Sequence, residues 1–424
     1  MAVSFRGPRK FFTILLFMAP TLIALLILSV YPITYNIYMS TQNKNTFRPR
    51  ANCNGEEVNG VTPSSFETTL VNIMEPTCWS VFQQSSVQGR GGFYGTADPV
   101  LANYQRLYGD LFSAESLKSA LMVLVIFIPL FVVSTARKQV NKSLSPPQTW
   151  WWWLVGIGAI YLLWRVLDGS QYFGQLMATG DFFVVTFRTI LYVLACIPFF
   201  FVVGLTYALI LNNPDIKGLS IWRLLLILPW AVQSYIAALV WQFFFRGEVG
   251  TINQLLNLLN ICNIGVTCPT WLGDPQKPYL AFFAVVVINL WMSYPFFTVI
   301  ILGALQSIPA DQYEAADVDG ATWWEKLTMI TLPLIRPAIL PAIVLSSITT
   351  FQMFNTVWLV TRGGPPSGAG MPGYTEFVML YAYELFQSQN AGIMGAFAVI
   401  VFIMLFLATL YSLRFTRITK GAYE

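Results

Sequence analysis

The sequence predicts an all-α protein that crosses a membrane several times. Of its 424 residues, 56% are hydrophobic and only 10% are charged, whereas roughly a quarter of the residues in a soluble domain carry charge. A soluble surface of this size needs far more charged side chains than that. The apolar residues also gather into runs close to the ~20 residues that a helix needs to cross a bilayer. These observations exclude a soluble globular fold.

Several classes of function are excluded by residue types that the sequence lacks. The chain contains no histidine, which excludes a Ser-His-Asp triad, a histidine-ligated zinc site and a histidine proton relay. Its formal net charge of +4 gives no basis for nucleic-acid binding. It also contains no G-x-x-x-x-G-K-S/T phosphate loop, so any ATP hydrolysis coupled to its function is expected on a separate subunit.

Eight apolar segments are candidates for spanning helices. They lie near residues 11–38, 119–136, 150–167, 182–211, 221–245, 279–306, 338–360 and 391–413. None of them contains an Asp or a Glu, and the second and third are the shortest. The first continues through Tyr31 and Pro32 and has no small-residue cleavage site, so we expect it to be retained rather than removed as a signal peptide.

Lysine and arginine residues in the short connections predict the orientation of the chain, because cytoplasmic connections are enriched in them. With eight spans and both termini in the cytoplasm, these residues fall on one side. They are Arg6, Arg9, Lys10, Arg137, Lys138, Lys142, Lys217, Lys326, Arg336, Arg414, Arg417 and Lys420. Arg165, Arg188 and Arg223 lie near span ends, where they can reach the interface. The long polar stretch 41–117 then lies outside the cell membrane.

Four of the five cysteines fall in segments that this topology places outside. Cys53 and Cys78 lie in the first outer stretch, and Cys262 and Cys268 lie between the fifth and sixth spans. An oxidising compartment permits disulfides, and local pairing, Cys53 with Cys78 and Cys262 with Cys268, is the simplest connectivity. Free thiols are the alternative. Cys196 lies within a span and is expected to be a packing residue.

The connection between the sixth and seventh spans, residues 308–335, differs from every other loop. Pro309 is a plausible helix start, and Gly320, which tolerates positive φ, is a plausible helix end. A second helix is expected over 321–329, stopped by Pro333. A short helix, a glycine turn and a second helix would form a rigid element against which a cytoplasmic partner can bind. An ordinary amphipathic loop helix is the alternative.

This connection resembles the EAA loop of ABC importer permeases, whose spacing is Glu-Ala-Ala, three residues, Gly, nine residues, Ile-x-Leu-Pro. The matching residues are Glu314, Ala315, Ala316, Gly320, Ile330, Leu332 and Pro333, with Asp319 in the same segment. The resemblance implies that the loop docks on an ATP-hydrolysing subunit. Glu314 would offer a carboxylate to a basic group, and Ala315 and Ala316 would permit close approach. ATP-driven closure would then move the loop as a rigid body and tilt the spans.

Other segments resemble the carbohydrate-uptake branch of these permeases, and within it the maltose/maltodextrin group. They are 19–21, 31–32, 103–107, 228–232, 351–355, 361–365 and 372–376. Arg188 departs from the Asn-Thr that the family usually carries there. The resemblance implies a type I ABC importer fold of six helices with an inserted hairpin. It divides the chain into an N-terminus and first span (1–40), an outer region (41–117), the hairpin (118–180) and a permease core (181–424) with the coupling loop.

The candidate substrate path lies in the sixth and seventh spans. Pro295 is expected to interrupt the hydrogen bonding of its helix and to free carbonyls near Trp291. By resemblance, the sugar pocket maps onto Asn289, Trp291, Ser293, Phe296, Ser346, Thr350, Met353 and Asn355. Amides and hydroxyls suit sugar hydroxyls, and indole suits their C–H faces. The alternative for the polar residues is helix–helix hydrogen bonding, worth about 0.6 kcal/mol each, and Phe296 and Met353 are as readily packing residues.

The resemblance implies the permease subunit of a binding-protein-dependent ABC importer that moves a neutral sugar, maltose, maltodextrin or a related oligosaccharide, across a bacterial or archaeal plasma membrane. The implied partners are a cytoplasmic ABC ATPase dimer, a second permease subunit, an extracytoplasmic sugar-binding protein, the sugar and the lipid bilayer. We assign no catalytic or metal-binding residue and no cofactor to this chain, because ATP and Mg²⁺ belong on the ATPase. The identity of the sugar, and whether the permease pair is homodimeric or heterodimeric, stay open.

Two other classes of function are disfavoured by the same spans. An ion-coupled secondary transporter or channel usually places acidic residues or histidine within the membrane, and the eight segments contain neither. A membrane-embedded enzyme would need catalytic spacing that the outer acids, among them Glu56, Glu57, Glu67 and Glu75, do not have.

Overall fold

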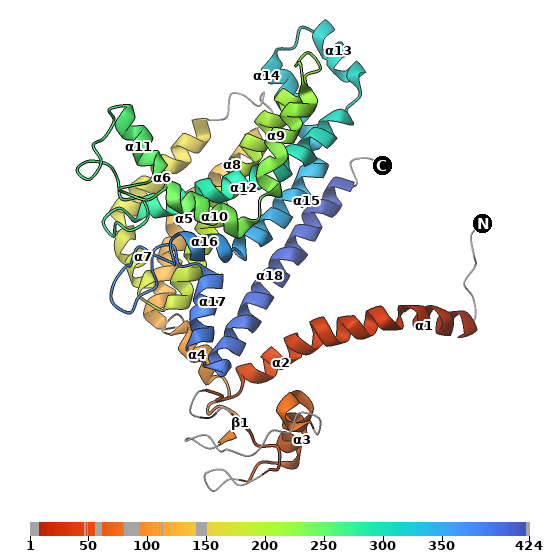
Figure 1. The fold of residues 1–424 in the computed structure, drawn as a ribbon, viewed down its shortest axis with the longest axis vertical. Helices are drawn as coiled ribbons and strands as arrows, with labels where there is room; N and C mark the ends of the chain where they lie inside the picture. The colour runs from red at the N-terminus through yellow and green to blue at the C-terminus, as the bar shows by residue number, and fades with distance from the viewer. Residues whose placement is uncertain are drawn as a thin grey trace. The chain divides into compact units, whose positions relative to one another are not determined.

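The computed structural model describes residues 8–45, 48, 50–55, 62–79, 93–109, 111, 113–140 and 151–420. The chain divides into two compact units, and Figure 1 labels their helices and strands. The first unit comprises Met1–Leu107 and Ala382–Leu405, and the second comprises Tyr108–Tyr381 and Phe406–Glu424. Each unit has its own cluster of buried apolar side chains.

A long apolar helix opens the first unit (Figure 1). Its two α-helical parts, α1 (Pro8–Leu25) and α2 (Tyr31–Ser40), are joined by a π-helical turn, η1 (Leu26–Val30). The π turn ends two residues before Pro32. Its wider backbone accommodates the proline, which has no amide N–H and would clash with an ordinary preceding turn. Residues 16–40 are long and apolar enough to cross a membrane, as the sequence predicts.

The residues that follow α2, 41–101, are named here the α2–α4 segment. They and the next helix contain β1 (Arg50–Ala51), α3 (Ser65–Met74), η2 (Pro76–Cys78), β2 (Phe93–Tyr94) and α4 (Ala102–Tyr108). The two strands pair in parallel, and a disulfide joins Cys53 to Cys78. Asn103 in α4 donates to the carbonyls of Ser40, at 2.9 Å, and Gln42, at 2.8 Å. These bonds fix α4 against the end of α2.

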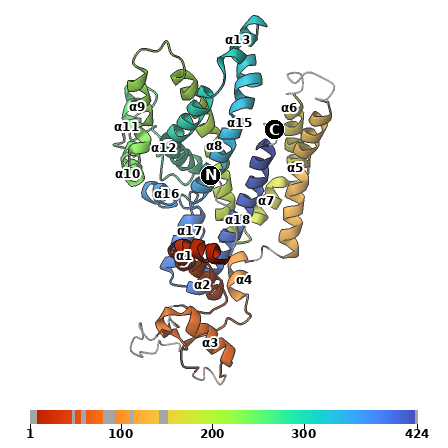
Figure 2. The ribbon, with the colours of Figure 1, turned by 90° about the vertical axis from the view of Figure 1, so that its right-hand side faces the viewer.

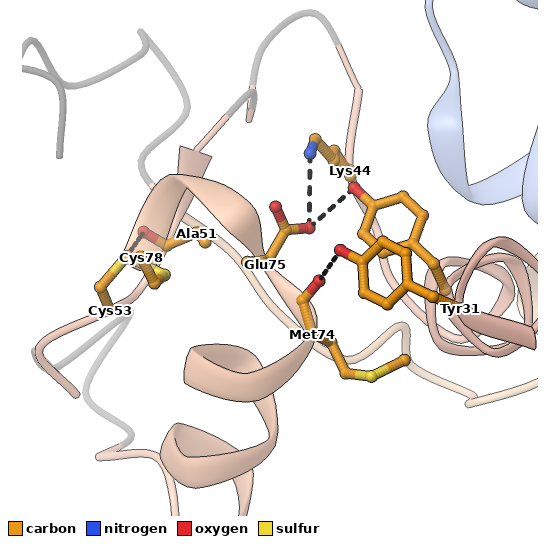
Figure 3. Close-up of polar contacts among 8 residues, drawn as sticks. Tyr31, Lys44, Ala51, Cys53, Met74, Glu75 and Cys78 are labelled. Atoms are coloured by element: carbon orange, nitrogen blue, oxygen red, sulfur yellow. Dashed lines mark hydrogen bonds and ion pairs between the residues drawn. A yellow bond between two sulfur atoms is a disulfide. The ribbon is translucent and has the colours of Figure 1, made fainter. Parts of the chain in front are cut away.

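Tyrosines of α2 hold the end of α3 in place (Figure 3). The Tyr31 hydroxyl donates to the carbonyl of Met74 at 3.0 Å. The Tyr35 hydroxyl donates to Oε1 of Glu75 at 3.1 Å, and the same oxygen lies 3.5 Å from Nζ of Lys44. Glu75 is only 1% exposed. A carboxylate this deeply buried needs such partners, because transfer out of water is otherwise costly.

The second unit begins with a helical hairpin. It consists of α5 (Ala114–Val140), α6 (Trp151–Val166) and the short α7 (Gly169–Met177), and Figure 2 shows α5 and α6 side by side. Ser119 of α5 donates to Oε1 of Gln175 of α7 at 2.8 Å. Phe173 of α7 meets Phe187 of the next helix with ring centroids 5.2 Å apart. The hairpin is therefore packed onto the remainder of the unit through α7.

The core of the second unit is built around two long helices, α8 (Asp181–Leu211) and α12 (Pro278–Gln306), which pack along their length. Gly204 permits this approach, because a Cβ at that position would lie 2.5 Å from Cβ of Phe297. The other helices of this unit are α9 (Leu219–Ala231), α10 (Ser234–Phe244), α11 (Thr251–Leu258), α13 (Ala310–Val318), α14 (Trp323–Glu325), η4 (Lys326–Thr331), α15 (Leu332–Phe351) and α16 (Asn355–Val360). The last two helices, α17 (Val378–Gln387) and α18 (Ala391–Lys420), are divided between the units, because residues 382–405 belong to the first. The connection between α11 and α12 carries a disulfide between Cys262 and Cys268.

Within the described residues, six helices are long and apolar enough to cross a membrane. They lie at 16–40, 114–136, 181–211, 278–306, 323–351 and 391–412. The pair α9 and α10 passes the same test only when taken together. The third of the eight segments predicted from the sequence is α6, an apolar helix of 16 residues, which is shorter than the ~20 residues of a usual span.

The structure corrects the sequence-based prediction of uninterrupted helices. The predicted span 221–245 is two helices bent by 93° between Ala231 and Ser234, whereas α12 runs through Pro295 without a break. Pro333 does not stop a helix, because it lies in the first turn of α15 directly after the π-helical turn η4. As at Pro32, the wider turn removes the clash that a proline ring makes with an α-helical turn. The predicted span 338–360 is divided into α15 and α16.

Candidate coupling loop and membrane pocket

The loop between α12 and α15 folds as the residue pattern predicts at its start and its turn. Pro309 is the N-cap of α13, and Gly320 has φ of +71°, a left-handed conformation that favours glycine. The next helical turn begins with a capping box. The Thr322 hydroxyl accepts from the Glu325 amide at 3.3 Å, and the Glu325 carboxylate accepts from the Thr322 amide at 2.8 Å. Figures 1 and 2 show α13 at the end of the unit, beyond α15.

Two contacts tie the arms of this loop together across the glycine turn. The hydroxyl groups of Tyr313 in α13 and Thr331 in η4 are 3.0 Å apart, and Nζ of Lys326 in η4 forms an ion pair with Asp317 in α13. The Ala316 side chain is buried beneath them. Because η4 continues directly into α15, the loop and α15 form one continuous element.

The exposed face of the loop combines a carboxylate with large apolar side chains. Glu314, Ala315, Asp319 and Gly320 are all exposed. Val318, Trp323 and Trp324 are 88%, 63% and 64% exposed. Ala316 faces inward, Leu332 packs against the core, and Pro333 is exposed at the start of α15. Of the predicted docking residues, Glu314, Ala315, Asp319 and Gly320 thus lie on the free surface together, whereas Ala316 and Leu332 support them from inside.

A cavity of about 340 Å³ lies where α9 and α10 break. Of the eight residues predicted for the substrate path, it is lined by Asn289, Ser293 and Met353. Asn289 and Ser293 are four residues apart in α12, so they lie on one face of that helix. The Ser293 hydroxyl donates to Oδ1 of Asn289 at 3.2 Å, and Nδ2 of Asn289 lies 3.7 Å from Sγ of Cys196. Asn289 is thereby held in one orientation.

The other five predicted path residues do not line this cavity. Trp291 follows Asn289 by two positions, which turns it to another face of the helix, and its ring lies 5.9 Å from that of Trp241. Phe296 packs on Trp230 and Phe297, with ring centroids 6.1 and 5.8 Å apart. Ser346 and Thr350 are buried in α15, and Asn355 is exposed at the start of α16.

The sequence reasoning did not assign the side of the cavity that comes from the broken helix pair. Trp230, Gln233 and Ser234 line it, together with Met292. The Leu-Pro-Trp sequence at 228–230 was a usable signal, because it matches a segment of the carbohydrate-uptake permeases. Neither Val232 nor Gln233, at the break itself, is a glycine or a proline, and Pro229 lies in the last turn of the preceding helix. All the residues that line the cavity are uncharged.

Arg188 of α8 has a different role from the interfacial position that its place near a span end suggests. Its Nη1 donates to the carbonyl of Pro372 at 2.9 Å and to that of Gly373. Its guanidinium lies 5.1 Å from the ring centre of Tyr374, a cation–π distance. One residue further along α8, the Thr189 hydroxyl accepts from the amide of Val378 at 2.9 Å. The two side chains fix the loop before α17 to α8.

The chain is mostly helical, with several apolar spans, an uncharged cavity at a broken span and a folded loop at the helix ends. These are the features of a membrane transport protein. The family described as "Binding-protein-dependent transport system inner membrane component" matches residues 172–420, and the chain belongs to this family. The match confirms the predicted class, a multi-pass permease of a binding-protein-dependent ABC importer with the type I fold. It begins within α7, so the α2–α4 segment and the helices α5 and α6 lie outside it.

Several curated relatives are named as permeases of sugar transport systems. A trehalose/maltose transport system permease of Thermococcus litoralis is 32% identical over 252 residues, which cover 59% of this chain and 80% of the relative. A maltose/maltodextrin permease of Vibrio vulnificus is 34% identical over 225 residues, which cover 52% of this chain and 42% of the relative. The chain thus spans less than half the length of the Vibrio protein.

Among solved structures, a chain of a bacterial alginate ABC transporter in complex with a pentasaccharide-bound periplasmic protein is similar to this one. It is 23% identical, with a TM-score of 0.49, and the match covers 68% of this chain and 96% of that chain.

Proposed function

We propose that this permease moves a neutral oligosaccharide of the maltose or maltodextrin kind inward through the cavity at the α9–α10 break. The observation that carries the proposal is the lining of that cavity, which combines two amides, two serine hydroxyls, an indole and two thioethers without any charge. Amides and hydroxyls can donate to and accept from sugar hydroxyls, and the indole of Trp230 offers a flat apolar face. The names of the curated relatives support the same sugar class.

We further propose that a cytoplasmic ABC ATPase dimer drives this movement by binding the loop around Glu314. The exposed carboxylate would meet a basic group, and the exposed Val318, Trp323 and Trp324 would supply apolar area. ATP and Mg²⁺ would be held by that ATPase. Both chain termini then lie in the cytoplasm, and a second permease subunit and an extracytoplasmic sugar-binding protein complete the importer.

The coupling path runs along α15. This helix begins at Leu332, next to the loop, and ends at Phe351, two residues before Met353 in the cavity lining. A push on the loop would therefore move a wall of the cavity, as alternating access requires. Ile335 and Ile339 of α15 are buried in the core cluster with residues of α8 and α12. A movement of α15 would therefore also move these two helices.

The test is reconstitution of this chain in vesicles with its ATPase, second permease and binding protein. Maltotriose is expected to stimulate ATP hydrolysis and to enter the vesicles, and Glu314→Ala should uncouple the two. Asp311→Ala is the matched control, because it removes an exposed carboxylate from the same helix and is not one of the predicted docking residues. Uptake of maltotriose by this chain without ATP, or stimulation by an acidic oligosaccharide such as an alginate fragment but not by maltotriose, would contradict the proposal.

A further inference from the structure

The helix α3 of the α2–α4 segment carries large apolar side chains on two faces. On one face Leu70, Val71 and Met74 pack against the buried cluster of the first unit. On another, Phe66 and Ile73, which lie seven residues and therefore about two turns apart, are 74% and 61% exposed. A helix at a protein surface in water carries polar side chains away from its buried face. The exposed pair on α3 therefore favours an apolar partner.

The position of Tyr31 along the first helix places it at one edge of the membrane. The elements α1, η1 and α2 make residues 8–40 one continuous helix. Residues 11–30, directly after Lys10, are its most apolar part, whereas the turns beyond them contain tyrosines and Asn36. About 20 helical residues cross the ~30 Å hydrocarbon core. A span that begins after Lys10 therefore reaches the opposite interface at Tyr31, and tyrosine and tryptophan are enriched at such interfaces.

Two contacts bring the end of α3 to the level of Tyr31. The Tyr31 hydroxyl donates to the carbonyl of Met74 at 3.0 Å, as Figure 3 shows, and its ring centroid lies 6.2 Å from that of Trp79. Ile73 directly precedes Met74, and Trp79 is 39% exposed. The apolar window of the span itself is 0% buried. The exposed side chains of Ile73 and Trp79 therefore lie next to the span, at the depth of the interface, and continue its apolar surface.

The carboxylate at this end of α3 is withdrawn from the surface. Glu75 follows Met74 directly, but it is only 1% exposed. Its Oε1 accepts from the Tyr35 hydroxyl at 3.1 Å and lies 3.5 Å from Nζ of Lys44, as Figure 3 shows for Lys44. An exposed carboxylate at this depth would be costly to bring against lipid. A buried and paired one is compatible with a lipid-facing surface.

We propose that Ile73 and Trp79 form a membrane-contact surface, which inserts into the lipid interface at the end of the first span. The partner is the bilayer, because the surface adjoins the lipid-facing side of the span. The disulfide between Cys53 and Cys78, next to Trp79, ties this surface to the residues after β1. The contact would thus fix the height of the α2–α4 segment above the membrane, whichever sugar the permease moves.

The test places a fluorophore at position 73 of the full chain in lipid nanodiscs. Four of the five native cysteines are bridged and Cys196 is buried, so a nitrobenzoxadiazole maleimide on Ile73→Cys reports this position. Interfacial side chains reach about 5–10 Å into the boundary between headgroups and acyl chains. A lipid with a nitroxide near the start of its acyl chain is therefore expected to quench this label strongly, and iodide in the water weakly.

Gln105→Cys with the same label is the matched control. Gln105 is exposed on α4, and Asn103 of α4 bonds to the carbonyl of Ser40, nine positions and roughly 13 Å beyond Tyr31 along the helix. The nitroxide lipid should quench the label at position 73 about threefold more than the label at 105, and iodide should give the opposite order.

Equal quenching of the two labels by the nitroxide lipid would overturn the membrane contact, because position 73 would then lie in water. A label at position 73 that neither quencher reaches would also overturn it, because another protein surface would then cover α3. Both labelled chains should keep the unfolding temperature of the parent, since each label replaces an exposed side chain.

Discussion

Lys326 of η4 forms an ion pair with Asp317 of α13 across the turn at Gly320. With the nearby contact between Tyr313 and Thr331, the pair closes the loop into a single folded element attached to α15. If the loop could bend at Gly320, a displacement of α13 by a partner would not reach α15. A loop whose two arms are held together would move with α15 as one body. The proposed coupling to an ATPase requires this element to be rigid.

Breaking the ion pair alone should have a small effect. Asp317 is 62% exposed, and exposed pairs contribute about 0–1 kcal/mol. Asp317→Asn is therefore expected to lower sugar-stimulated ATP hydrolysis less than threefold, and to do so more at low than at high salt. The charge-swapped variant, Asp317→Lys with Lys326→Asp, should recover most of the loss. A tenfold loss from Asp317→Asn alone would mean that this carboxylate contacts the ATPase directly.

Gly320 tests the turn itself, because no atom lies within 4 Å of where its Cβ would be. Only the positive φ opposes a side chain there, at about 1–2 kcal/mol for an ordinary residue and less for asparagine. Gly320→Asn is expected to keep most of the sugar-stimulated ATP hydrolysis, whereas Gly320→Val should lose most of it. Equal loss in both variants would show that space for the partner, rather than backbone conformation, requires glycine at this position.

Ser293 and Ser346 provide a matched comparison within the membrane. Ser293 lines the cavity, whereas Ser346 is buried in α15 and does not. Removing one sugar hydrogen bond costs about 1 kcal/mol, so Ser293→Ala should raise the sugar concentration for half-maximal uptake about fivefold. Ser346→Ala should leave it within twofold of the parent. The opposite order, measured in the same vesicles, would place the substrate path along α15 instead of at the α9–α10 break.

Arg188 is expected to stabilise the loop before α17 rather than to bind sugar. Its guanidinium bonds to the carbonyls of Pro372 and Gly373, and a hydrogen bond from a charged group contributes about 1.5–3 kcal/mol. Arg188→Gln should lower the unfolding temperature and expose residues 363–376 to protease. Arg188→Lys should be intermediate, because an ammonium group lacks the planar fork. Unchanged cleavage of the loop in Arg188→Gln would contradict this role.

The two disulfides should contribute unequally to stability, because they close loops of different length. The sequence separations are 25 residues for Cys53–Cys78 and 6 residues for Cys262–Cys268. Loop-closure entropy predicts about 3.5 and about 2 kcal/mol respectively. Thermal unfolding of Cys53→Ser/Cys78→Ser and Cys262→Ser/Cys268→Ser variants checks the order. A larger loss from the short bridge would show that strain or packing, not chain entropy, dominates.

The sequence predicted where the helices lie along the chain better than it predicted which face of each helix lines the cavity. Apolar runs located every long helix, because a bilayer solvent requires apolar surface and internally bonded backbone. The resemblance to sugar permeases indicated Asn289 and Ser293 of α12 as pocket residues, and both line the cavity. Ser346 and Thr350 have the same spacing, yet they face the protein interior, because the rotation of α15 is set by packing that no local pattern records.

Helix breaks and turns were harder to predict, because a proline can end a helix, begin one or lie within a continuous one. Pro295 lies within a continuous helix, and Pro333 lies in the first turn of another. The break that forms the cavity lies at Val232 and Gln233, between α9 and α10. Neither residue is a local helix breaker, and the nearby proline, Pro229, lies inside the last turn of α9.

The most direct test of the account is uptake of labelled maltotriose by vesicles that contain the complete importer, measured with ATP inside or absent. The account predicts uptake only with ATP and the sugar-binding protein present. It also predicts that Gly320→Val and Ser293→Ala each impair uptake, the first by uncoupling ATP hydrolysis and the second by weakening sugar affinity. Equal uptake without ATP, or full uptake in the Gly320→Val importer, would contradict the claim that the folded loop couples ATP hydrolysis to sugar movement through the membrane cavity.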